Sequence, residues 1–326
     1  MEPLQILSRK KNNLFQSEAW ADLQALYEKK TWVVKSDNIQ ALVIKSPLVR
    51  NKFYFYSPRG PLVSSKIKKQ DIRIFFRKIE SLAWEEGVIF YRIEPYSLGQ
   101  SDLYDFGFRK TTNFSPLSRQ HSPENTLILD ITKSKNELLA LMKPKWRYNI
   151  NLAMRKGVSI REGKTKDDIG IFYELTKEVE SRGDYRGFDK EYYLNMFRVL
   201  GRKNDLALYI AEIDGEALGA VIISFFGTVA TYIHGATSSN KRELMPMYLL
   251  QWAAIREAKT RGCFLYDFWG IAPNDSKFHP WAGITRFKKG FGGIPLNLSG
   301  TFDLPFDKGY YRTLTVLNRL KKVIKK

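Results

Sequence analysis

Cationic and aromatic side chains are interleaved over one stretch of the chain, and RNA binding requires this combination. Between Lys143 and Arg161 there are six cations, two aromatic residues and no acid. The aromatic residues, Trp146 and Tyr148, are suited to stacking on bases while the cations contact phosphates. The cations expected to do so are Lys143, Lys145, Arg147, Arg155 and Lys156. The alternative is a solvated helix face with Trp146 in the core.

A second basic stretch lies at the C-terminal end. From Arg312 to Lys326 six cations alternate with apolar residues at helical spacing, namely Leu314, Leu317, Leu320 and Ile324. The pattern predicts an amphipathic basic helix. We expect its leucines to pack on the first domain, because Leu and Ile without an exposed Trp or Phe anchor a helix weakly in a membrane interface. The alternative is peripheral contact with an anionic membrane.

The composition favours a polyanionic partner and disfavours several kinds of site. Lys and Arg number 53 against 34 for Asp and Glu, a net charge of +19. The one cysteine, Cys263, excludes an intramolecular disulfide and a cysteine-based metal cluster. The histidines have no metal-ligand spacing, so we expect no metal and assign structural or surface roles to His121, His234 and His279. The motifs of serine hydrolases, P-loop proteins and dinucleotide-binding proteins do not occur.

No export signal or membrane span is expected. A basic polar run, Arg9 to Asn13, stands where a signal peptide would have an apolar segment. The longest apolar stretch, Ala220 to Phe226, is far shorter than the ~20 residues of a transmembrane helix. We therefore expect a protein of the reducing cytoplasm whose only membrane contact is peripheral.

The chain contains an internal repeat. At one constant offset, Gly60 aligns with Gly235, Gly87 with Gly262, and Tyr91 with Tyr266. At a slightly larger offset, the segment LYDFGF ending at Phe108 aligns with RFKKGF ending at Phe291. Both copies are expected to form a strand, a glycine turn, an amphipathic helix closed by glycine, and a buried strand. The pattern predicts one α/β unit used twice.

The elements can be placed coarsely. Capping-box spacing at Ser134 and Glu137 predicts a helix that opens the second copy. We therefore expect domain 1 over residues 1–133, completed by 295–326, and domain 2 over 134–294, with a cleft between them. Other expected elements are a helix capped by Ser17, strands at 32–34 and 41–45, helices at 72–86, 144–157, 167–181 and 190–200, and a hairpin of 206–213 with 217–226 turned at Asp214 and Gly215.

Four ordered motifs resemble the FemABX family of aminoacyl-tRNA-dependent peptidyltransferases: KPKWRYNINLAMRKGV, RGDYRGFDKEYY, YDFWGI and RFKKGFGG. The resemblance covers essentially the whole chain and is closest to the FemX-like type, since no heptad pair of a coiled-coil arm is inserted in the second copy. It implies an α/β fold of two tandem N-acetyltransferase-like (GNAT-like) domains. That implication agrees with the duplication, which was found independently.

The resemblance also implies a reaction. An amino acid would pass from aminoacyl-tRNA to the amine of a muramyl-peptide precursor, either lipid-linked or nucleotide-linked, as part of peptidoglycan bridge building. A net charge of +19 suits two polyanionic substrates. We expect no cofactor, because SSNKRELMP after Gly235 offers no glycine-rich loop for the pyrophosphate of coenzyme A. The alternatives are an aminoacyl-tRNA-protein transferase and an RNA-binding protein without transferase chemistry. We expect a monomer.

Site residues follow from the same resemblance. Phe287 and Lys288 match the Phe-Lys pair at the transfer site, and aminolysis of an ester needs a fixed positive donor for its oxyanion. We expect Lys288 to serve as that donor and to stay charged in an open, phosphate-rich cleft. Asp267 is a candidate for orienting the amine, with a structural role as the alternative. The residues expected to contact the acceptor are Lys29, Tyr96, Arg186, Tyr192 and Tyr248.

Overall fold

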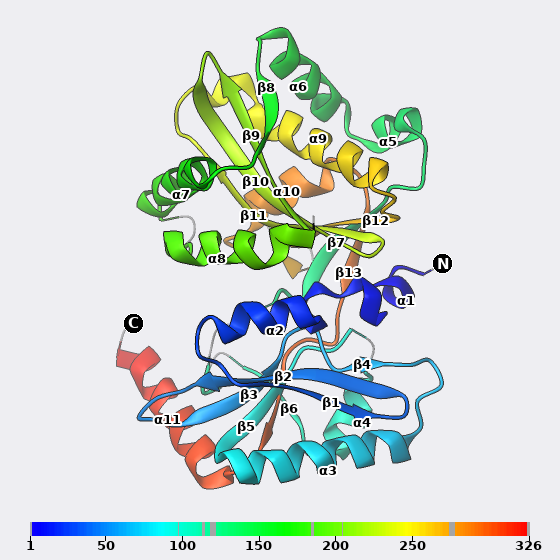
Figure 1. Cartoon of the computed structure of the whole chain (residues 1–326), viewed down its shortest axis with the longest axis vertical. Coiled ribbons are helices and arrows are strands. Elements are labelled where there is room, and N and C mark those ends of the chain that lie inside the picture. The colour runs from blue at the N-terminus through cyan, green and yellow to red at the C-terminus, as the bar shows by residue number, and fades with distance from the viewer. Residues whose placement is uncertain are drawn as a thin grey trace. The chain divides into compact units, whose positions relative to one another are not determined.

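The chain forms two units, each built around its own mixed sheet (Figure 1). The structure is a computed structural model that describes residues 2–96, 98–112, 115–117, 122–183, 186–203, 205–273 and 278–324. Unit 1 comprises Met1–Glu124 and Asn297–Lys326, and unit 2 comprises Asn125–Leu296. Within the described residues each sheet has seven strands.

The sheet of unit 1 has the strand order β1-β2-β3-β5-β14-β6, with β4 beside β2. Helix α3 covers one face and buries Ile72, Phe75 and Ile79 against it. The elements are α1 (Pro3–Leu7), η1 (Lys10–Asn12), η2 (Leu14–Gln16), α2 (Glu18–Ala25), β1 (Thr31–Ser36), β2 (Ile39–Pro47), β3 (Phe53–Ser57), β4 (Leu62–Val63), α3 (Lys69–Glu86), β5 (Val88–Ile93), α4 (Gln100–Asp105), β6 (Arg109–Lys110), β14 (Phe302–Pro305) and α11 (Lys308–Ile324).

The sheet of unit 2 has the order β13-β7-β12-β11-β10-β9-β8. Its core lies between this sheet and helices that include α6 and α9, which supply Trp146, Ile150 and Ile255. The elements are β7 (Asn125–Asp130), α5 (Lys135–Leu141), α6 (Pro144–Arg155), β8 (Ser159–Gly163), α7 (Lys166–Ser181), α8 (Lys190–Leu200), η3 (Gly201–Lys203), β9 (Leu206–Ile213), β10 (Glu216–Phe226), β11 (Val229–Thr237), η4 (Arg242–Leu244), α9 (Pro246–Thr260), β12 (Leu265–Gly270), α10 (Ala282–Lys289) and β13 (Ile294–Asn297).

Local signals in the sequence position these elements as predicted. The Ser17 hydroxyl accepts from the Trp20 amide and caps α2. Ser134 and Glu137 form the reciprocal capping box of α5. Pro144 is the first residue of α6, where its missing N–H costs no hydrogen bond. The β9–β10 hairpin turns at Asp214 and Gly215, which have positive φ values of 50° and 80°.

The duplication is confirmed by the pairing of equivalent strands. In unit 1, Phe55 of β3 pairs in parallel with Tyr91 of β5. In unit 2, Ala230 of β11 pairs in parallel with Tyr266 of β12, and both strands keep the constant offset of the sequence repeat. The connecting helices, α3 and α9, are each followed by a left-handed glycine, Gly87 and Gly262. The two copies are therefore the same α/β unit used in tandem.

The boundary between the units differs from the one expected at residue 133. Strand β7 pairs with β12 of unit 2, so residues 125–130 belong to unit 2 rather than to the first domain. In unit 1 the corresponding place beside β5 is taken by β14, which arrives from the C-terminal segment. The apolar run Leu127–Leu129 is buried in this strand and would fit a place in either sheet, so only the hydrogen-bonding partner decides between them.

Candidate functional site

Lys288 lies in the last turn of α10 with its side chain inside unit 2. The residue is 6% exposed, and its Nζ donates to the Gly270 carbonyl oxygen at 2.7 Å. The same Nζ lies 5.4 Å from the ring centroid of Tyr232 on β11. Helix α10, the end of β12 and β11 therefore fix the ammonium group. Within the described residues the bond to Gly270 occupies one of the three donors of the Lys288 ammonium group.

Burial changes the acid-base chemistry of this lysine. It lowers the pKa of Lys288 to about 7, and the charge of Asp267 opposes that shift. A group with such a pKa exchanges protons readily near neutral pH. The expectation that Lys288 stays fully charged in an open cleft is therefore wrong, because the side chain is enclosed by Tyr232 and the end of β12.

Asp267 is buried within β12 and belongs to the local hydrogen-bond network. Its Oδ1 accepts from the Thr126 hydroxyl of β7 and from the Trp269 amide, the latter at 2.7 Å. The pairing of β12 with β7 shifts register between Asp267 and Gly270, and Trp269 has a φ of +64°. The structure supports a role for Asp267 in setting the charge of Lys288.

An aromatic cluster holds the C-terminal end of α10 against α6. The Trp146 Nε1 donates to the Phe287 carbonyl oxygen at 2.8 Å, and the Lys143 amide donates to the Gly290 carbonyl oxygen at 2.9 Å. Tyr248 packs edge to face against both Trp146 and Phe287. A Cβ at Gly290 would stand 2.0 Å from Trp146, so only glycine fits there. The KPKW and FKKG segments are far apart in sequence but pack against each other and are joined by hydrogen bonds.

The predicted RNA-binding stretch divides into buried and exposed residues. Trp146 is 7% exposed and belongs to the core, as the alternative interpretation stated. Arg147 donates to the carbonyl oxygens of Leu139 and Met142 at 3.2 and 2.5 Å, so it closes the end of α5. Tyr148 is exposed, with the Arg155 guanidinium 5.9 Å from its ring centroid. The cations of this stretch that remain exposed are Lys143, Lys145, Arg155 and Lys156.

Two predicted acceptor residues lie at the N-terminal end of α8. Tyr192 stacks on Phe188 with ring centroids 4.0 Å apart, and both rings lie near His234 of β11. Arg186 is exposed on the segment before them. The His234 Nε2 is buried without a hydrogen-bond partner among the described residues, and burial lowers the pKa of His234 to about 4. The sequence predicted only a structural or surface role for His234. This histidine aligns with the buried Arg59 of the first copy.

The other two acceptor candidates, Lys29 and Tyr96, lie in unit 1. The Lys29 Nζ donates to the Gln24 side chain at 3.0 Å, and partial burial lowers the pKa of Lys29. Tyr96 is buried, with the Arg59 guanidinium carbon 5.4 Å from its ring centroid. Neither side chain is therefore fully exposed to a ligand.

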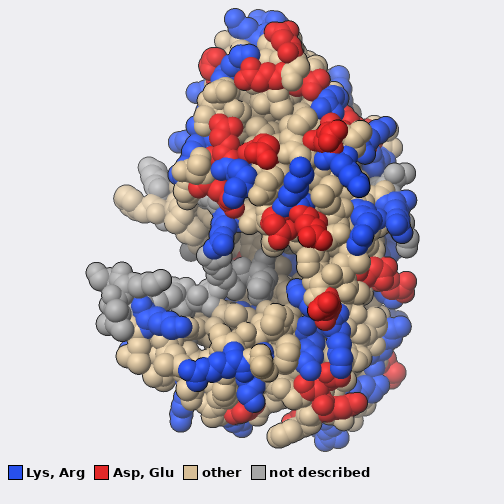
Figure 2. Space-filling model, turned by 60° about the vertical axis from the view of Figure 1, so that its left-hand side comes forward, with Lys and Arg blue, Asp and Glu red and all other residues tan. Residues whose placement is uncertain are grey.

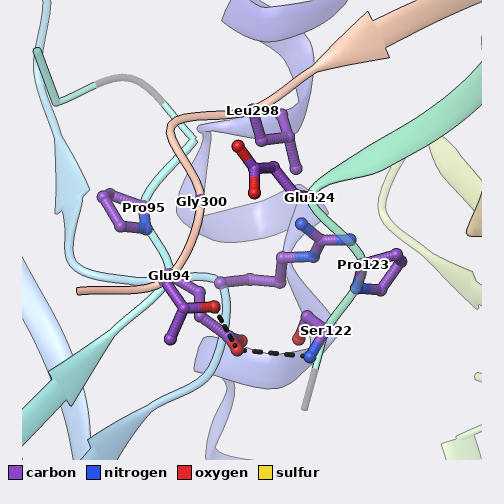
Figure 3. Close-up of a pocket in the computed structure, with 9 residues that line it drawn as sticks. Glu94, Pro95, Ser122, Pro123, Glu124, Leu298 and Gly300 are labelled. Atoms are coloured by element: carbon purple, nitrogen blue, oxygen red, sulfur yellow. Dashed lines mark hydrogen bonds between the residues drawn. The ribbon is translucent and has the colours of Figure 1, made fainter. Parts of the chain in front are cut away.

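Arg59 also lines a small recess of unit 1 (Figure 3). The floor of this recess is tied together by Glu94, whose carboxylate accepts from the Ser122 amide at 3.2 Å and from the Thr301 hydroxyl at 3.3 Å. These bonds join β5 to the segments before β7 and β14. The recess is too narrow to hold a peptide or nucleotide ligand.

The distribution of charged and metal-ligating residues bears on which partners the protein can bind. On the face drawn in Figure 2, Lys and Arg are spread over the surface with Asp and Glu between them. On this face the charges therefore mark no single contact surface. In the part of the chain that the structure describes, no three His, Cys, Asp or Glu residues gather as a metal site would require. His121 lies outside the described residues. Within the same part, no helix has the length and apolar character needed to cross a bilayer.

Known proteins resemble the chain over most of its length. A profile of the FemAB family matches residues 7–219 and 214–319. "Aminoacyltransferase FemA" of Staphylococcus epidermidis is 22% identical, with 86% of this chain and 87% of that protein covered. "Lipid II:glycine glycyltransferase" of Staphylococcus aureus (strain MRSA252) is 20% identical, with 95% and 92% covered.

Solved structures show the same fold. The crystal structure of FemX superposes with a TM-score of 0.83 at 19% identity, covering 97% of this chain and 99% of that one. A tandem GNAT protein of the clavulanic acid biosynthesis pathway superposes with a TM-score of 0.53 at 13% identity, covering 88% and 94%. The tandem GNAT-like fold expected from the sequence is confirmed.

Proposed function

The chain belongs to the FemAB family, and on that premise we propose that it transfers an amino acid from aminoacyl-tRNA to the stem-peptide amine of a peptidoglycan precursor. The reaction class is aminoacyl transfer, since the relatives are named as an aminoacyltransferase and a glycyltransferase. The name of the latter favours a lipid-linked muramyl peptide over a nucleotide-linked one as the acceptor. The tRNA donor would place the protein in the cytoplasm.

The proposal rests mainly on the ammonium group of Lys288, which is enclosed within unit 2. The acceptor amine attacks the ester carbonyl carbon, and the C–O bond to the tRNA ribose breaks as the amide forms. The attacking nitrogen loses a proton in this step, and the ribose oxygen takes one up and leaves as the hydroxyl of the free tRNA. The intermediate carries an oxyanion, and a fixed cation in a dry site stabilises it strongly. Lys288 in its charged form has two donors for that oxygen beyond the one that Gly270 uses. Phe287 has no hydroxyl, so its part is to pack beside Tyr248 and fix the end of α10.

We assign the donor to the exposed basic face of α6. Its cations Lys143, Lys145, Arg155 and Lys156 suit phosphate contacts, and Tyr148 offers an exposed ring for stacking. Trp146 on the same helix bonds to the carbonyl of Phe287, next to Lys288. A tRNA held on α6 would therefore have its backbone fixed relative to the transfer site.

We propose that no coenzyme A or other cofactor takes part. The segment after β11 would have to bind a pyrophosphate with its backbone N–H groups. Instead the Ser239 amide donates to the Glu178 carboxylate, and Arg182 donates to the Ser239 hydroxyl at 2.7 Å and to the Thr237 carbonyl at 3.0 Å. A carboxylate at this place disfavours a second anion.

The acceptor contacts remain part of the proposal. Tyr248 has the strongest support, because it touches Phe287 directly. Tyr192 and Arg186 lie on and beside the aromatic group at α8. Tyr96 is buried and needs an opening of unit 1 to reach a ligand, whereas Lys29 is only partly buried. We propose that the protein acts as a monomer.

The decisive experiment supplies purified protein with a pool of pre-charged tRNAs. Three acceptors are compared by intact mass: a lipid-linked muramyl pentapeptide, its nucleotide-linked counterpart, and a peptide with a basic N-terminus. A mass increase of one or more amino acids on a muramyl acceptor supports the proposal, and addition of EDTA should not reduce it. Modification of the basic peptide alone would indicate a protein-modifying transferase. Binding of tRNA with no product on any acceptor would indicate an RNA-binding protein.

A further inference from the structure

Helix α11 is attached to unit 1 along one side (red in Figure 1). Tyr311 is buried against Phe90 of β5, and its hydroxyl bonds to Asp303 at 2.9 Å. Two helical turns later, Asn318 donates to the carbonyl oxygens of Ser115 and Pro116 at 2.8 and 3.0 Å. Because residues two turns apart lie on the same side of a helix, these contacts define its inner side.

The outer side of α11 is apolar. Val316, Leu317 and Leu320 are 50%, 45% and 53% exposed. At about 100° per residue, Leu320 lies about 180° around the helix from Tyr311. The expectation that the leucines pack on the first domain is therefore wrong for Leu317 and Leu320, because Tyr311 and Asn318 take the inner side. A surface helix normally shows the opposite arrangement, with its apolar side inward.

Cations border the apolar stripe on both edges. Arg312 and Arg319 lie about 80° to 100° from Tyr311, on one edge of the outer side, and Lys321 lies on the other edge. All three are exposed. Within Arg312–Lys321 the sequence contains no acid. The chemistry of this surface is an aliphatic strip between positive edges.

We propose that the outer side of α11 binds peripherally to an anionic lipid surface, with Val316, Leu317 and Leu320 entering the interface and Arg312, Arg319 and Lys321 contacting lipid headgroups. Charge complementarity favours a bilayer as the occupant. Three aliphatic side chains give only weak insertion, so stable binding needs the added attraction of cations to anionic lipid, and α11 supplies both. The inference does not rest on the transfer reaction.

The first test is co-sedimentation of the full chain with vesicles of phosphatidylglycerol and phosphatidylcholine (1:1), against vesicles of phosphatidylcholine alone. Wild type should sediment with the anionic vesicles at low salt only. The variant R312Q/R319Q/K321Q should partition about 10²-fold more weakly, since each cation near an anionic surface contributes about fivefold. The matched control K66Q/R73Q/R77Q removes three exposed cations elsewhere on unit 1 and should bind like wild type.

The apolar strip is tested separately. L317S/L320S changes exposed side chains, so its melting temperature should match wild type while its vesicle binding falls at least tenfold. A probe at Leu320→Cys reports insertion directly, because the only native cysteine, Cys263, is buried. An environment-sensitive dye at that position should shift to the blue with anionic vesicles.

Several results would overturn the inference. One is wild type that stays in the supernatant with anionic vesicles at low salt. Another is equal sedimentation of wild type and both α11 variants, which would place the lipid contact on other cations. A third is a dimer, seen by sedimentation velocity, that L317S/L320S converts to monomer, which would show that a second copy covers the strip.

Discussion

Arg92 of β5 and Asp267 of β12 occupy equivalent positions in the two units, each directly after a tyrosine paired in parallel with the neighbouring strand. Arg92 is fully buried and forms two 2.7 Å bonds to Asp303 of β14. Asp267 accepts from Thr126 and acts on the charge of Lys288. Unit 1 therefore has a buried ion pair at this position, whereas the equivalent aspartate of unit 2 influences the ionisable Lys288. We therefore propose that the acid-base chemistry of transfer belongs to unit 2.

Replacement of Lys288 by Met should lower the rate of transfer by about 10²- to 10³-fold while acceptor affinity stays nearly unchanged, because the lost interaction forms with the oxyanion. Folding should be preserved, since methionine fills the volume of a buried lysine without a charge to desolvate. Single-turnover rates with pre-charged tRNA measure the effect. Lys289→Met is the matched control, and near wild-type turnover by Lys288→Met would exclude the donor role.

The pH profile of transfer should contain a falling limb near pH 7. Burial lowers the pKa of Lys288 to about 7, so the charged form that stabilises the oxyanion is lost as pH rises through that value. Asp267→Asn removes the charge that supports the ammonium and should move the limb to lower pH. Lys288→Arg keeps its charge and should move the limb to higher pH. Profiles of kcat/KM that coincide for wild type and both variants would contradict this assignment.

The same pKa predicts how stability depends on pH. The folded pKa of Lys288 is below its unfolded value of 10.5, so between about pH 7 and 10.5 the unfolded chain binds the extra proton. Stability should therefore rise with pH across that window and gain nothing from this group below pH 7. Chemical denaturation at pH 7 and pH 9.5 tests the sign. The rise should be smaller in Lys288→Met, which has no group to titrate.

Binding of tRNA should depend linearly on the logarithm of salt concentration, and its slope should fall by about one for each phosphate-contacting cation neutralised. Lys145→Gln and Lys156→Gln should each reduce the slope, whereas the control Lys166→Gln at the start of α7 should not. Arg147→Gln should leave the slope unchanged and lower the melting temperature, because Arg147 bonds to the carbonyls that end α5. A reduced slope in Arg147→Gln would show that Arg147 also contacts phosphate.

Removal of one partner of the buried pair in unit 1 should destabilise the fold by about 3–5 kcal/mol, since the other charge is left uncompensated. Arg92→Met leaves Asp303 buried, with the Tyr311 hydroxyl as a remaining donor. The comparison is Lys241→Met, which breaks an exposed pair with Glu216 and should cost less than about 1 kcal/mol. Denaturant unfolding of both variants measures the difference, and equal losses would refute it.

Local features were predictable because they depend on neighbours in sequence. The caps at Ser17 and Ser134 and the turn at Asp214 need only nearby backbone groups, and the structure has them as predicted. The duplication was also visible, because the same glycines and tyrosines recur where equivalent strands pair. The boundary expected after residue 133 lies earlier in the structure, since β7 joins the sheet of unit 2 through pairing with β12, a strand far along the chain.

What the sequence by itself determined is the α/β unit used twice, its elements and the motifs that carry Lys288. What only the tertiary structure decided is the environment of those side chains. Trp146, Arg147 and Lys288 all lie in segments that the sequence presents as basic and exposed, yet Trp146 packs on Gly290, Arg147 bonds to α5 and Lys288 is enclosed at the end of β12. The outward side of α11 was misassigned for the same reason. Helical spacing reveals that an apolar side exists, but contacts made by residues distant in sequence, such as Asn318 with Ser115, decide which side faces the protein.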